Sequence, residues 1–376
     1  MTTPLNIGLV ARCLNTDHVR GMGKYVLELL KCSDAGGDDA RWTLLASNPA
    51  LPLLHPPGPR FRTDVFEQRG DRFRLWEQWA LPHRSRGYGI DLLHCTEGAL
   101  PLWQPVPTVV TLHDTLAFEE RPDTPGERLY WDHLIPAALH KAAHVITISE
   151  SSRRDILARW PALASRLTVI HHGIDTAYFA PPEAPLPAAL QQALGSSPYA
   201  VYLGGPMARK RFDWALAVLQ AQPDAQLKLV ACGFGARHRE AARQALPAAL
   251  QGRVLFAEFL SDAELIALYA GARAVLYPTL YEGFGFPAIE AQAAGVPVIM
   301  SPVGSLPELA GPLARLVPTH DLAAWAAALS AEASLSPAQR QAQADAARQW
   351  ARSFTWERSH AAHLEIYRSV RAGARP

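Results

Sequence analysis

Two glutamates, Glu282 and Glu290, stand eight positions apart, with Gly283, Gly285 and Pro287 between them. The glycines allow a tight turn that brings backbone N–H groups close to a ligand, and Pro287 suits the first turn of a helix. A helix N-terminus offers N–H donors and partial positive charge to a phosphate, and carboxylates accept hydrogen bonds from sugar hydroxyls. The pattern therefore predicts a sugar phosphate site. A glycine turn that only packs a strand against a helix is the alternative.

The loop with the two glutamates lies between two short apolar runs. Residues 274–279 precede it and residues 296–301 follow it, and both runs favour β-strands. Because open parallel sheets bind ligands at the carboxyl ends of their strands, we expect this loop to lie at a ligand-binding edge.

A run of three cations follows a pair of glycines near the start of the second half of the chain. Gly204 and Gly205 end an apolar run, and Arg209, Lys210 and Arg211 come shortly after them. Arginine and lysine form charge-assisted hydrogen bonds with phosphate oxygens, so Arg209 and Lys210 are candidates to bind a diphosphate. A basic run exposed to solvent is the alternative.

The first half contains a comparable loop over residues 20–25, in which Gly21 and Gly23 allow close backbone approach to a diphosphate or an acceptor. A plain tight turn is the alternative. The loop is not a GxGxxG fingerprint, so no nicotinamide or flavin cofactor is predicted.

His113 and Asp114 follow the apolar run 108–112. If that run is a strand, both side chains lie at the same kind of edge. A histidine there can hydrogen-bond a hydroxyl or stabilise charge in a transition state. A purely structural histidine is the alternative.

Several common motifs are missing. There is no DxD pair and no histidine cluster with ligand spacing, so we expect no metal ion at the site. The P-loop and GxSxG motifs are also absent, which argues against a P-loop NTPase and an α/β-hydrolase.

Short apolar runs alternate with helical patterns along both halves of the chain. This rhythm predicts an α/β protein with two doubly wound, Rossmann-like domains that face each other across a cleft. The expected strands are 7–10, 42–46, 91–94, 108–112, 144–148, 167–170, 199–203, 227–231, 254–256, 274–277, 296–300 and 314–317.

A proline-rich stretch over 181–187 is the expected linker between the domains. We expect an N-terminal domain over 1–178 and a C-terminal domain over 179–354. The final helix, 355–371, packs back on the first domain or caps the second.

Composition narrows the class of protein. The chain has 376 residues and a net charge of +1, so it lacks the strong positive electrostatic field that would attract nucleic acid. No apolar run is long enough to span a bilayer, and a cytoplasmic protein is predicted.

Between Arg60 and Arg86, seven arginines interleave with aromatic residues. This segment either contacts the inner face of the cell membrane peripherally or forms a helix that covers the first sheet.

Taken together, these residues resemble the retaining, nucleotide-sugar-dependent glycosyltransferases of family 4, which have the GT-B fold, and the likeness spans nearly the whole chain. The segment from Glu282 to Glu290 is the most specific mark. The resemblance implies that Glu282 contacts the donor sugar and Glu290 the ribose hydroxyls, while amides of Phe284 and Gly285 bind the sugar and phosphate region.

By the same resemblance, Arg209 and Lys210 bind the diphosphate and His113 lies beside the transferred sugar. The remaining donor-binding candidates are Gly21, Gly23, Asp114, Gly204, Gly205, Gly283 and Phe286, with backbone near Phe259 and Leu260 contacting the base. One departure is that many members have Gly-Arg where this chain has Gly204-Gly205. Arg209 therefore has to supply the phosphate-binding arginine.

The resemblance implies transfer of a hexose from a nucleotide diphosphate sugar to a glycan or lipid-linked glycan, with retention at the anomeric carbon. The sequence is most similar to bacterial O-antigen and polysaccharide mannosyltransferase-like members, which favours GDP-mannose as donor. A UDP-sugar-dependent transferase of glucose or N-acetylglucosamine, an epimerase, a phosphorylase and a non-catalytic sugar-nucleotide-binding protein stay open.

Overall fold

The chain divides into two compact units in the computed structural model, which describes residues 4–17, 19, 21–36, 38–69, 74–120 and 124–373. Unit 1 comprises Met1–Gly173 and Thr355–Pro376, and unit 2 comprises Ile174–Phe354. The amide of Ile174 donates to the carbonyl of Phe354 at 3.1 Å, so the two chain crossings between the units lie side by side. The proline-rich stretch 181–187 lies inside unit 2, a few residues after the first crossing.

The described residues of unit 1 form a seven-stranded parallel sheet with the order β3-β2-β1-β4-β5-β6-β7. Val10 at the end of β1 lies opposite Leu45 of β2 and Cys95 of β4, so the strand order reverses between β1 and β4. The strands are β1 Asn6–Val10, β2 Arg41–Ala46, β3 Phe61–Val65, β4 Leu92–Cys95, β5 Thr108–Thr111, β6 His144–Thr147 and β7 Leu167–Val169.

The central strands of this sheet are almost entirely buried because both of their faces are covered. All four residues of β4 and of β5 are buried. Strand β3, in contrast, was missing from the expected strands. It reads Phe-Arg-Thr-Asp-Val and lies at the edge of the sheet, where exposed polar side chains hide the apolar pattern.

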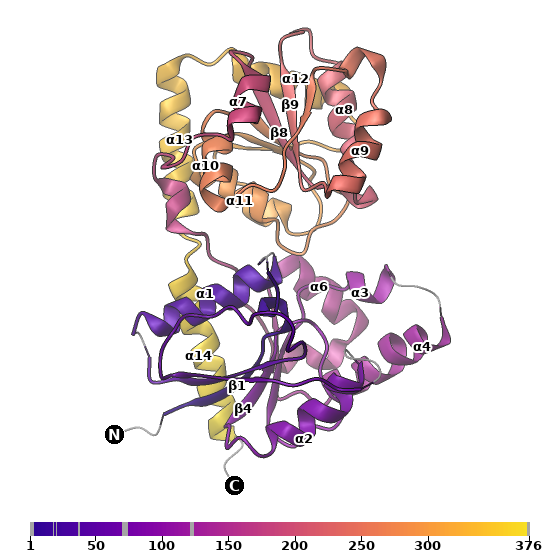
Figure 1. The fold of residues 1–376 in the computed structure, drawn as a ribbon, viewed down its shortest axis with the longest axis vertical. Helices are drawn as coiled ribbons and strands as arrows, with labels where there is room; N and C mark the ends of the chain where they lie inside the picture. Colours follow the sequence, from indigo (N-terminus) through magenta and orange to yellow (C-terminus); the bar gives the residue numbers. More distant parts are fainter. Residues whose placement is uncertain are drawn as a thin grey trace. The chain divides into compact units, whose positions relative to one another are not determined.

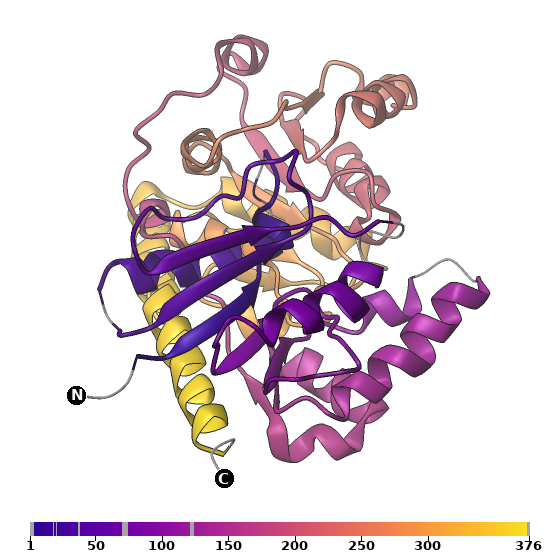
Figure 2. The ribbon, with the colours of Figure 1, turned by 60° about the horizontal axis from the view of Figure 1, so that its bottom comes forward.

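Helices and helical turns connect these strands. They are α1 Met22–Asp34, α2 Leu81–Ser85, α3 Leu116–Glu119, α4 Pro125–Arg128, α5 Ile135–Leu139, α6 Glu150–Arg159 and α14 Trp356–Gly373, with 3-10 turns Arg12–Leu14 and Pro161–Arg166 and π-helical turns Trp76–Ala80 and Leu129–Leu134. Figure 1 and Figure 2 both show α14, the last helix, running beside α1 and β4 of unit 1. The Thr355 side chain caps α14 by accepting from the Arg358 amide at 3.2 Å.

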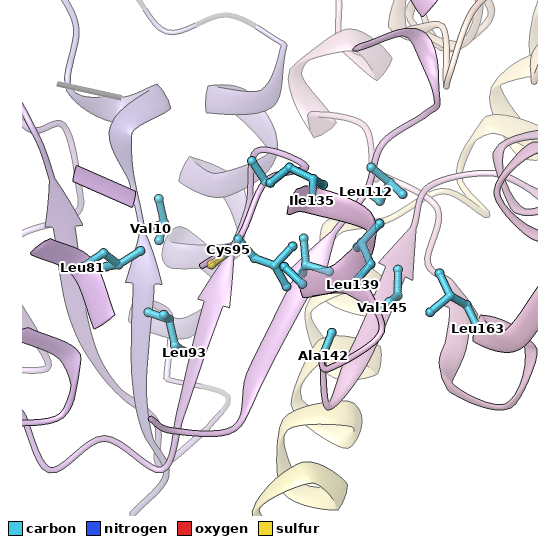
Figure 3. Packing of buried hydrophobic residues seen from close by; sticks show 14 of the residues in the cluster. Val10, Leu81, Leu93, Cys95, Leu112, Ile135, Leu139, Ala142, Val145 and Leu163 are labelled. Atoms are coloured by element: carbon cyan, nitrogen blue, oxygen red, sulfur yellow. The ribbon is translucent and has the colours of Figure 1, made fainter. Parts of the chain in front are cut away.

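The core of unit 1 fills the space between the sheet and the helices on one of its faces. Figure 3 shows side chains from β1, β4 and β6 meeting those of α2 and α5. Leu81, Leu93, Ile135, Leu139 and Val145 are fully buried there. This packing holds the strand ends that carry the candidate residues.

Unit 2 repeats the architecture with a six-stranded parallel sheet in the order β10-β9-β8-β11-β12-β13. Both units are therefore parallel-sheet, Rossmann-like domains, and the predicted fold class is confirmed. The strands are β8 Tyr199–Leu203, β9 Lys228–Cys232, β10 Val254–Phe256, β11 Ala274–Tyr277, β12 Val298–Met300 and β13 Ala314–Leu316.

Helices cover both faces of the second sheet. Ala200, Tyr202 and Leu276 project to one face, where they pack with α8 and α12. Their neighbours along the strands, such as Val201 and Tyr277, project to the opposite face. The elements are α7 Ala188–Leu194, α8 Phe212–Gln220, α9 Ala236–Gln244, α10 Asp262–Ala270, α11 Phe286–Ala293, α12 Leu322–Ala333 and α13 Pro337–Ala351, with 3-10 turns Thr176–Phe179, Ala208–Lys210, Ala248–Leu250 and Leu306–Leu309.

Candidate active site

The loops that follow β8 and β11 lie side by side at the carboxyl edge of the second sheet. Strands β8 and β11 are neighbours, and the strand order reverses between them. In open α/β sheets this reversal leaves a crevice in which ligands bind. The two loops that the sequence analysis singled out in the second half therefore meet at one place.

The loop after β8 is shaped by glycines. Gly205 has a φ of +61°, and a Cβ atom there would lie 2.5 Å from the carbonyl oxygen of Gly233. The Gly205 amide donates to the carbonyl of Cys232 at 3.1 Å, which ties this loop to the end of β9. The Tyr202 hydroxyl lies 3.1 Å from the Gly205 carbonyl and 3.3 Å from that of Lys210. Tyr202 thus holds both ends of the loop, a role that the sequence analysis missed.

The three consecutive cations point in different directions because a 3-10 turn, Ala208–Lys210, carries two of them. Arg211 follows that turn with a φ of +54° and pairs with Asp213 at 2.8 Å, near the start of α8. Arg209 and Lys210 instead face the loop after β11. Arg209 and Lys210 therefore stay candidates to bind a diphosphate, whereas Arg211 belongs to the helix start.

Backbone hydrogen bonds join Arg209 to the loop after β11. The carbonyl of Arg209 accepts from the Leu280 amide at 2.8 Å and from the Thr279 hydroxyl at 3.3 Å. The Arg209 guanidinium donates to the carbonyl of Tyr281 at 2.9 Å. Main chain and side chain of Arg209 are therefore both fixed.

Four side chains form one largely buried cluster at this edge: Lys210, Arg209, Tyr277 and Glu282. The Lys210 ammonium donates to the Glu282 carboxylate and, at 3.3 Å, to the Tyr277 hydroxyl. Arg209 lies 3.5 Å from the same carboxylate. Two cations thus share one carboxylate, which leaves one positive charge to be balanced. A phosphate group supplies the negative charge that balances it.

Burial shifts the pKa values of this cluster. It lowers the pKa of Lys210, whereas the neighbouring Glu282 carboxylate acts to raise that pKa. Burial and the same carboxylate raise the pKa of Tyr277 well above its ordinary value, so its hydroxyl stays protonated. Tyr277 was not among the predicted site residues. Its position as the last residue of β11 was the available signal.

The loop between Glu282 and α11 turns at Gly285. Its φ is +106°, and a Cβ atom there would lie 2.6 Å from the Leu306 side chain, so only glycine fits. The Ser305 hydroxyl donates to the carbonyls of Glu282, at 3.1 Å, and of Phe284. Gly283 and Phe284 are buried, and Phe286 begins α11. The turn therefore leads into a helix N-terminus, as its glycines predicted.

Glu290 lies on α11 with partners of its own. It is 5% exposed, and the Tyr269 hydroxyl donates to it at 3.4 Å. Burial first and Glu290 second raise the pKa of Tyr269 and of Tyr178. Glu290 is therefore grouped with two tyrosines, Tyr269 and Tyr178. The sequence analysis named neither tyrosine.

Phe259 and Leu260 lie between β10 and α10, at the same edge of the sheet. Phe259 is 63% exposed and Leu260 is partly buried. Strand β9 separates β10 from β8, so this loop and the glycine loop after β8 follow strands that are not neighbours in the sheet.

The candidate residues of the first half lie in unit 1. His113 follows β5 and its Nε2 hydrogen-bonds to the carbonyl of Thr96 at 2.8 Å, so Nε2 carries the proton and Nδ1 is an acceptor. Burial lowers the pKa of His113, which favours the neutral ring. Asp114 accepts from the Leu116 amide at 2.9 Å at the start of α3, a local structural role.

The glycine loop of unit 1 has a packing role. A Cβ atom at Gly23 would lie 2.8 Å from the carbonyl oxygen of Cys13, so this glycine lets α1 approach the turn after β1. Gly21 precedes α1 with a φ of +38° and open space around it. Arg20, which belongs to the same predicted loop, lies outside the described residues.

A buried chain of hydrogen bonds links α14 to the rest of unit 1. His363 Nδ1 donates to the Ser359 carbonyl at 2.7 Å, so its Nε2 accepts from the Tyr25 hydroxyl at 2.7 Å. Thr111 lies 3.0 Å from Tyr25 and 2.8 Å from His94 Nε2. Tyr367 then donates to His94 Nδ1 at 2.7 Å. His363 lies in the predicted final helix, 355–371, and the sequence analysis gave it no separate role.

An ion cluster occupies the strand reversal of unit 1. Arg12, just after β1, lies 3.3 Å from Glu97, just after β4, and 3.6 Å from the buried Glu77. The Cys13 amide donates to Glu97 at 2.9 Å. Burial raises the pKa of Glu77. The sequence signal was two opposite charges that each follow a predicted strand.

No group of three or more His, Cys, Asp or Glu side chains in residues 4–17, 19, 21–36, 38–69, 74–120 and 124–373 is arranged to hold a metal ion. Within the same residues, no helix combines the length and apolar character needed to cross a bilayer.

Comparison with protein families gives two matches that together span most of the chain. The model described as "Glycosyltransferase Family 4" matches residues 19–178, and the model described as "Glycosyl transferases group 1" matches residues 192–350. The first match falls largely in unit 1 and the second in unit 2.

Curated relatives point to the same class of enzyme. The chain is 30% identical over 227 residues to an O-antigen chain mannosyltransferase B of Escherichia coli, covering 58% of this chain and 59% of that protein. It is 29% identical over 392 aligned positions to a D-inositol 3-phosphate glycosyltransferase of Xylanimonas cellulosilytica, covering 94% and 92%. The first alignment thus includes less than two thirds of the mannosyltransferase.

Among solved structures, a sucrose-phosphate synthase from Thermosynechococcus elongatus aligns with a TM-score of 0.76. The alignment covers 98% of this chain and all of that one, at 22% sequence identity. This likeness shows a shared fold, the GT-B fold.

Proposed function

Because the chain belongs to glycosyltransferase family 4 and is a hexosyltransferase with the GT-B fold, we propose that it transfers mannose from GDP-mannose to a glycan or lipid-linked glycan in bacterial surface polysaccharide synthesis. In this proposal unit 2 binds the nucleotide sugar and unit 1 binds the acceptor. The observation that carries the proposal is the cluster of Arg209, Lys210 and Glu282 at the strand reversal of unit 2.

The proposed chemistry follows from the charges in that cluster. Bond cleavage between the anomeric carbon and the diphosphate leaves negative charge on the departing oxygen. Arg209 and Lys210 stabilise that charge, and the glycine loop and the N-terminus of α11 add N–H dipoles. The acceptor oxygen bonds to the anomeric carbon on the same face, and its proton passes to the leaving diphosphate. No covalent nucleophile is needed, and the configuration is retained.

The other predicted residues take supporting roles. Glu282 and the amides of Gly283, Phe284 and Gly285 orient the sugar, and Glu290 accepts hydrogen bonds from the ribose. The neutral His113 presents Nδ1 as an acceptor to a sugar hydroxyl, which its hydrogen bond to Thr96 supports. Gly21, Gly204, Gly205 and the backbone near Phe259 complete the donor-binding set.

A second candidate function is transfer of glucose or N-acetylglucosamine from a UDP-sugar to another acceptor. One observation favours an acceptor other than a glycan: the alignment with the D-inositol 3-phosphate glycosyltransferase spans 92% of that relative, whereas the mannosyltransferase alignment spans 59% of its own.

A donor panel separates the two candidates. The purified chain is melted with GDP-mannose, UDP-glucose or UDP-N-acetylglucosamine, and release of GDP or UDP is followed in parallel. A ligand at about one hundred times its Kd stabilises the folded protein by about 2.7 kcal/mol. We expect GDP-mannose alone to raise the melting temperature and to yield GDP. A shift with UDP-sugars alone supports the second candidate, and no shift with any donor contradicts both.

A further inference from the structure

The segment before and within α2 presents two opposite faces. Trp76 and Leu81 are fully buried, and the Trp76 indole donates to the Phe66 carbonyl at 3.0 Å. Leu75 and Trp79, on the other face, are 47% and 63% exposed. The inner face of this part of 60–86 packs as expected for a helix that covers the first sheet. Its outer face, however, is apolar as well. Phe73, part of the same predicted segment, lies outside the described residues.

The exposed aromatic side chains form a continuous ridge. Trp79 and His83 are one helical turn apart, with ring centroids 4.4 Å apart, and His83 Nδ1 donates to the Trp79 carbonyl at 2.7 Å. Trp103, 43% exposed, joins from the loop after β4, with its ring 4.7 Å from that of His83. We name Leu75, Trp79, His83 and Trp103 the aromatic ridge. Two exposed tryptophans that both pack against His83 exceed the scattered apolar residues of an ordinary surface.

Cations border this ridge, while nearby acids are buried or neutralised. Arg86 lies one turn beyond His83 on the same helical stripe, and the exposed Lys141 donates to the Leu102 carbonyl at 3.4 Å, next to Trp103. Asp64 is paired with Arg84, and Glu77 is buried. In the described part of 60–86, Glu67 is the remaining acid.

From this combination we propose that the aromatic ridge docks unit 1 on an anionic membrane surface. Tryptophan rings favour the headgroup level of a bilayer, and each nearby Lys or Arg adds attraction to anionic lipid. A peripheral contact of this kind needs no spanning helix. The inference rests on the proposed function for its purpose, which is to bring the enzyme to a lipid-linked acceptor.

Vesicle sedimentation tests the ridge without any donor or acceptor. The full chain is mixed with vesicles of phosphatidylcholine, with or without about one third phosphatidylglycerol. We expect sedimentation with the anionic vesicles and its loss at high salt. Trp79→Ala should weaken binding about tenfold or more, since a tryptophan is the largest apolar group that leaves the interface.

A matched pair of variants provides the control. Leu75→Ala on the ridge should reduce binding several-fold, while Leu316→Ala on β13 of unit 2, with a similar exposure of 41%, should leave it unchanged. All three variants should keep the wild-type melting temperature and release of nucleoside diphosphate.

Equal sedimentation of Leu75→Ala, Trp79→Ala and wild type, or a wild-type chain that stays in the supernatant with anionic vesicles, would overturn the proposal. Capture of a protein on the ridge without vesicle binding would also contradict it. If the donor panel fails but the ridge variants lose vesicle binding, the docking surface stands and the proposed function falls.

Discussion

The contributions of Lys210 and Glu282 to stability should depend on each other in the free protein. The two side chains should separate when donor binds. Their side chains are 13% and 9% exposed, so each change leaves a mostly buried charge with weaker partners. In Lys210→Met, Glu282 keeps Arg209 at 3.5 Å, and in Glu282→Gln, Lys210 keeps the Tyr277 hydroxyl at 3.3 Å. We expect each single variant to lose about 2 kcal/mol of unfolding free energy, or about 4–8 °C in melting temperature.

The double variant measures the pair directly. Because neither buried charge remains, its loss should be smaller than the sum of the single losses by about 1–3 kcal/mol. Donor changes this balance, since the diphosphate replaces Glu282 as the partner of Lys210. We therefore expect the coupling to shrink when unfolding is repeated with saturating GDP. Lys210→Met should also bind GDP about 10–100 times more weakly, the loss of one charge-assisted contact.

The assay is denaturant unfolding of the four proteins, with and without GDP, together with initial rates of transfer. Lys210→Met should lower kcat by about 10²–10³, as for removal of one group that stabilises developing charge. Additive stability losses in the free protein would refute the buried pair. An unchanged GDP affinity and rate in Lys210→Met would refute the assignment of the cluster to the diphosphate.

Three further predictions follow from single contacts. Tyr277→Phe should lower kcat/KM about tenfold, whereas Tyr199→Phe, which loses a 2.9 Å hydrogen bond to Leu268 at the other end of β8, should lose about 1 kcal/mol of stability and keep its rate. Glu290→Gln should raise the KM for donor about tenfold with a smaller change in kcat, because ribose contacts persist through the reaction; a fall in kcat alone would contradict this role. Burial lowers the pKa of His363 to about 4, so between about pH 6.5 and pH 4 the unfolded chain binds a proton that the folded chain does not, and stability should fall by about 3 kcal/mol as pH drops through that window. His363→Gln should flatten this dependence in denaturant melts, and an unchanged slope would exclude His363 as its source.

Local patterns in the sequence predicted the main features of unit 2. The runs 199–203, 254–256 and 274–277 coincide with β8, β10 and β11, because buried parallel strands are continuous apolar runs. The turn at Gly285 could be predicted because only glycine fits a position with a positive φ and close packing. Proximity of Arg209 and Lys210 to Glu282 followed from the rule that strand reversals gather loops at one edge.

Features that depend on contacts between residues distant in the sequence could not be predicted from local patterns. Strand β3 was missed because one of its edges is unpaired and its polar residues face solvent. The tyrosines that hold Lys210 and Glu290 look like ordinary strand and helix residues until the fold brings them together. The same holds for Tyr25, whose partner is His363, and for His94, whose partner is Tyr367; both partners lie on the last helix.

The most direct test is a crystal structure of the chain with bound GDP. We expect the diphosphate to lie within hydrogen-bond distance of the Lys210 ammonium and the Arg209 guanidinium, with Glu282 no longer bonded to Lys210. A diphosphate bound away from the edge of β8 and β11, with the Lys210 to Glu282 contact intact, would contradict it.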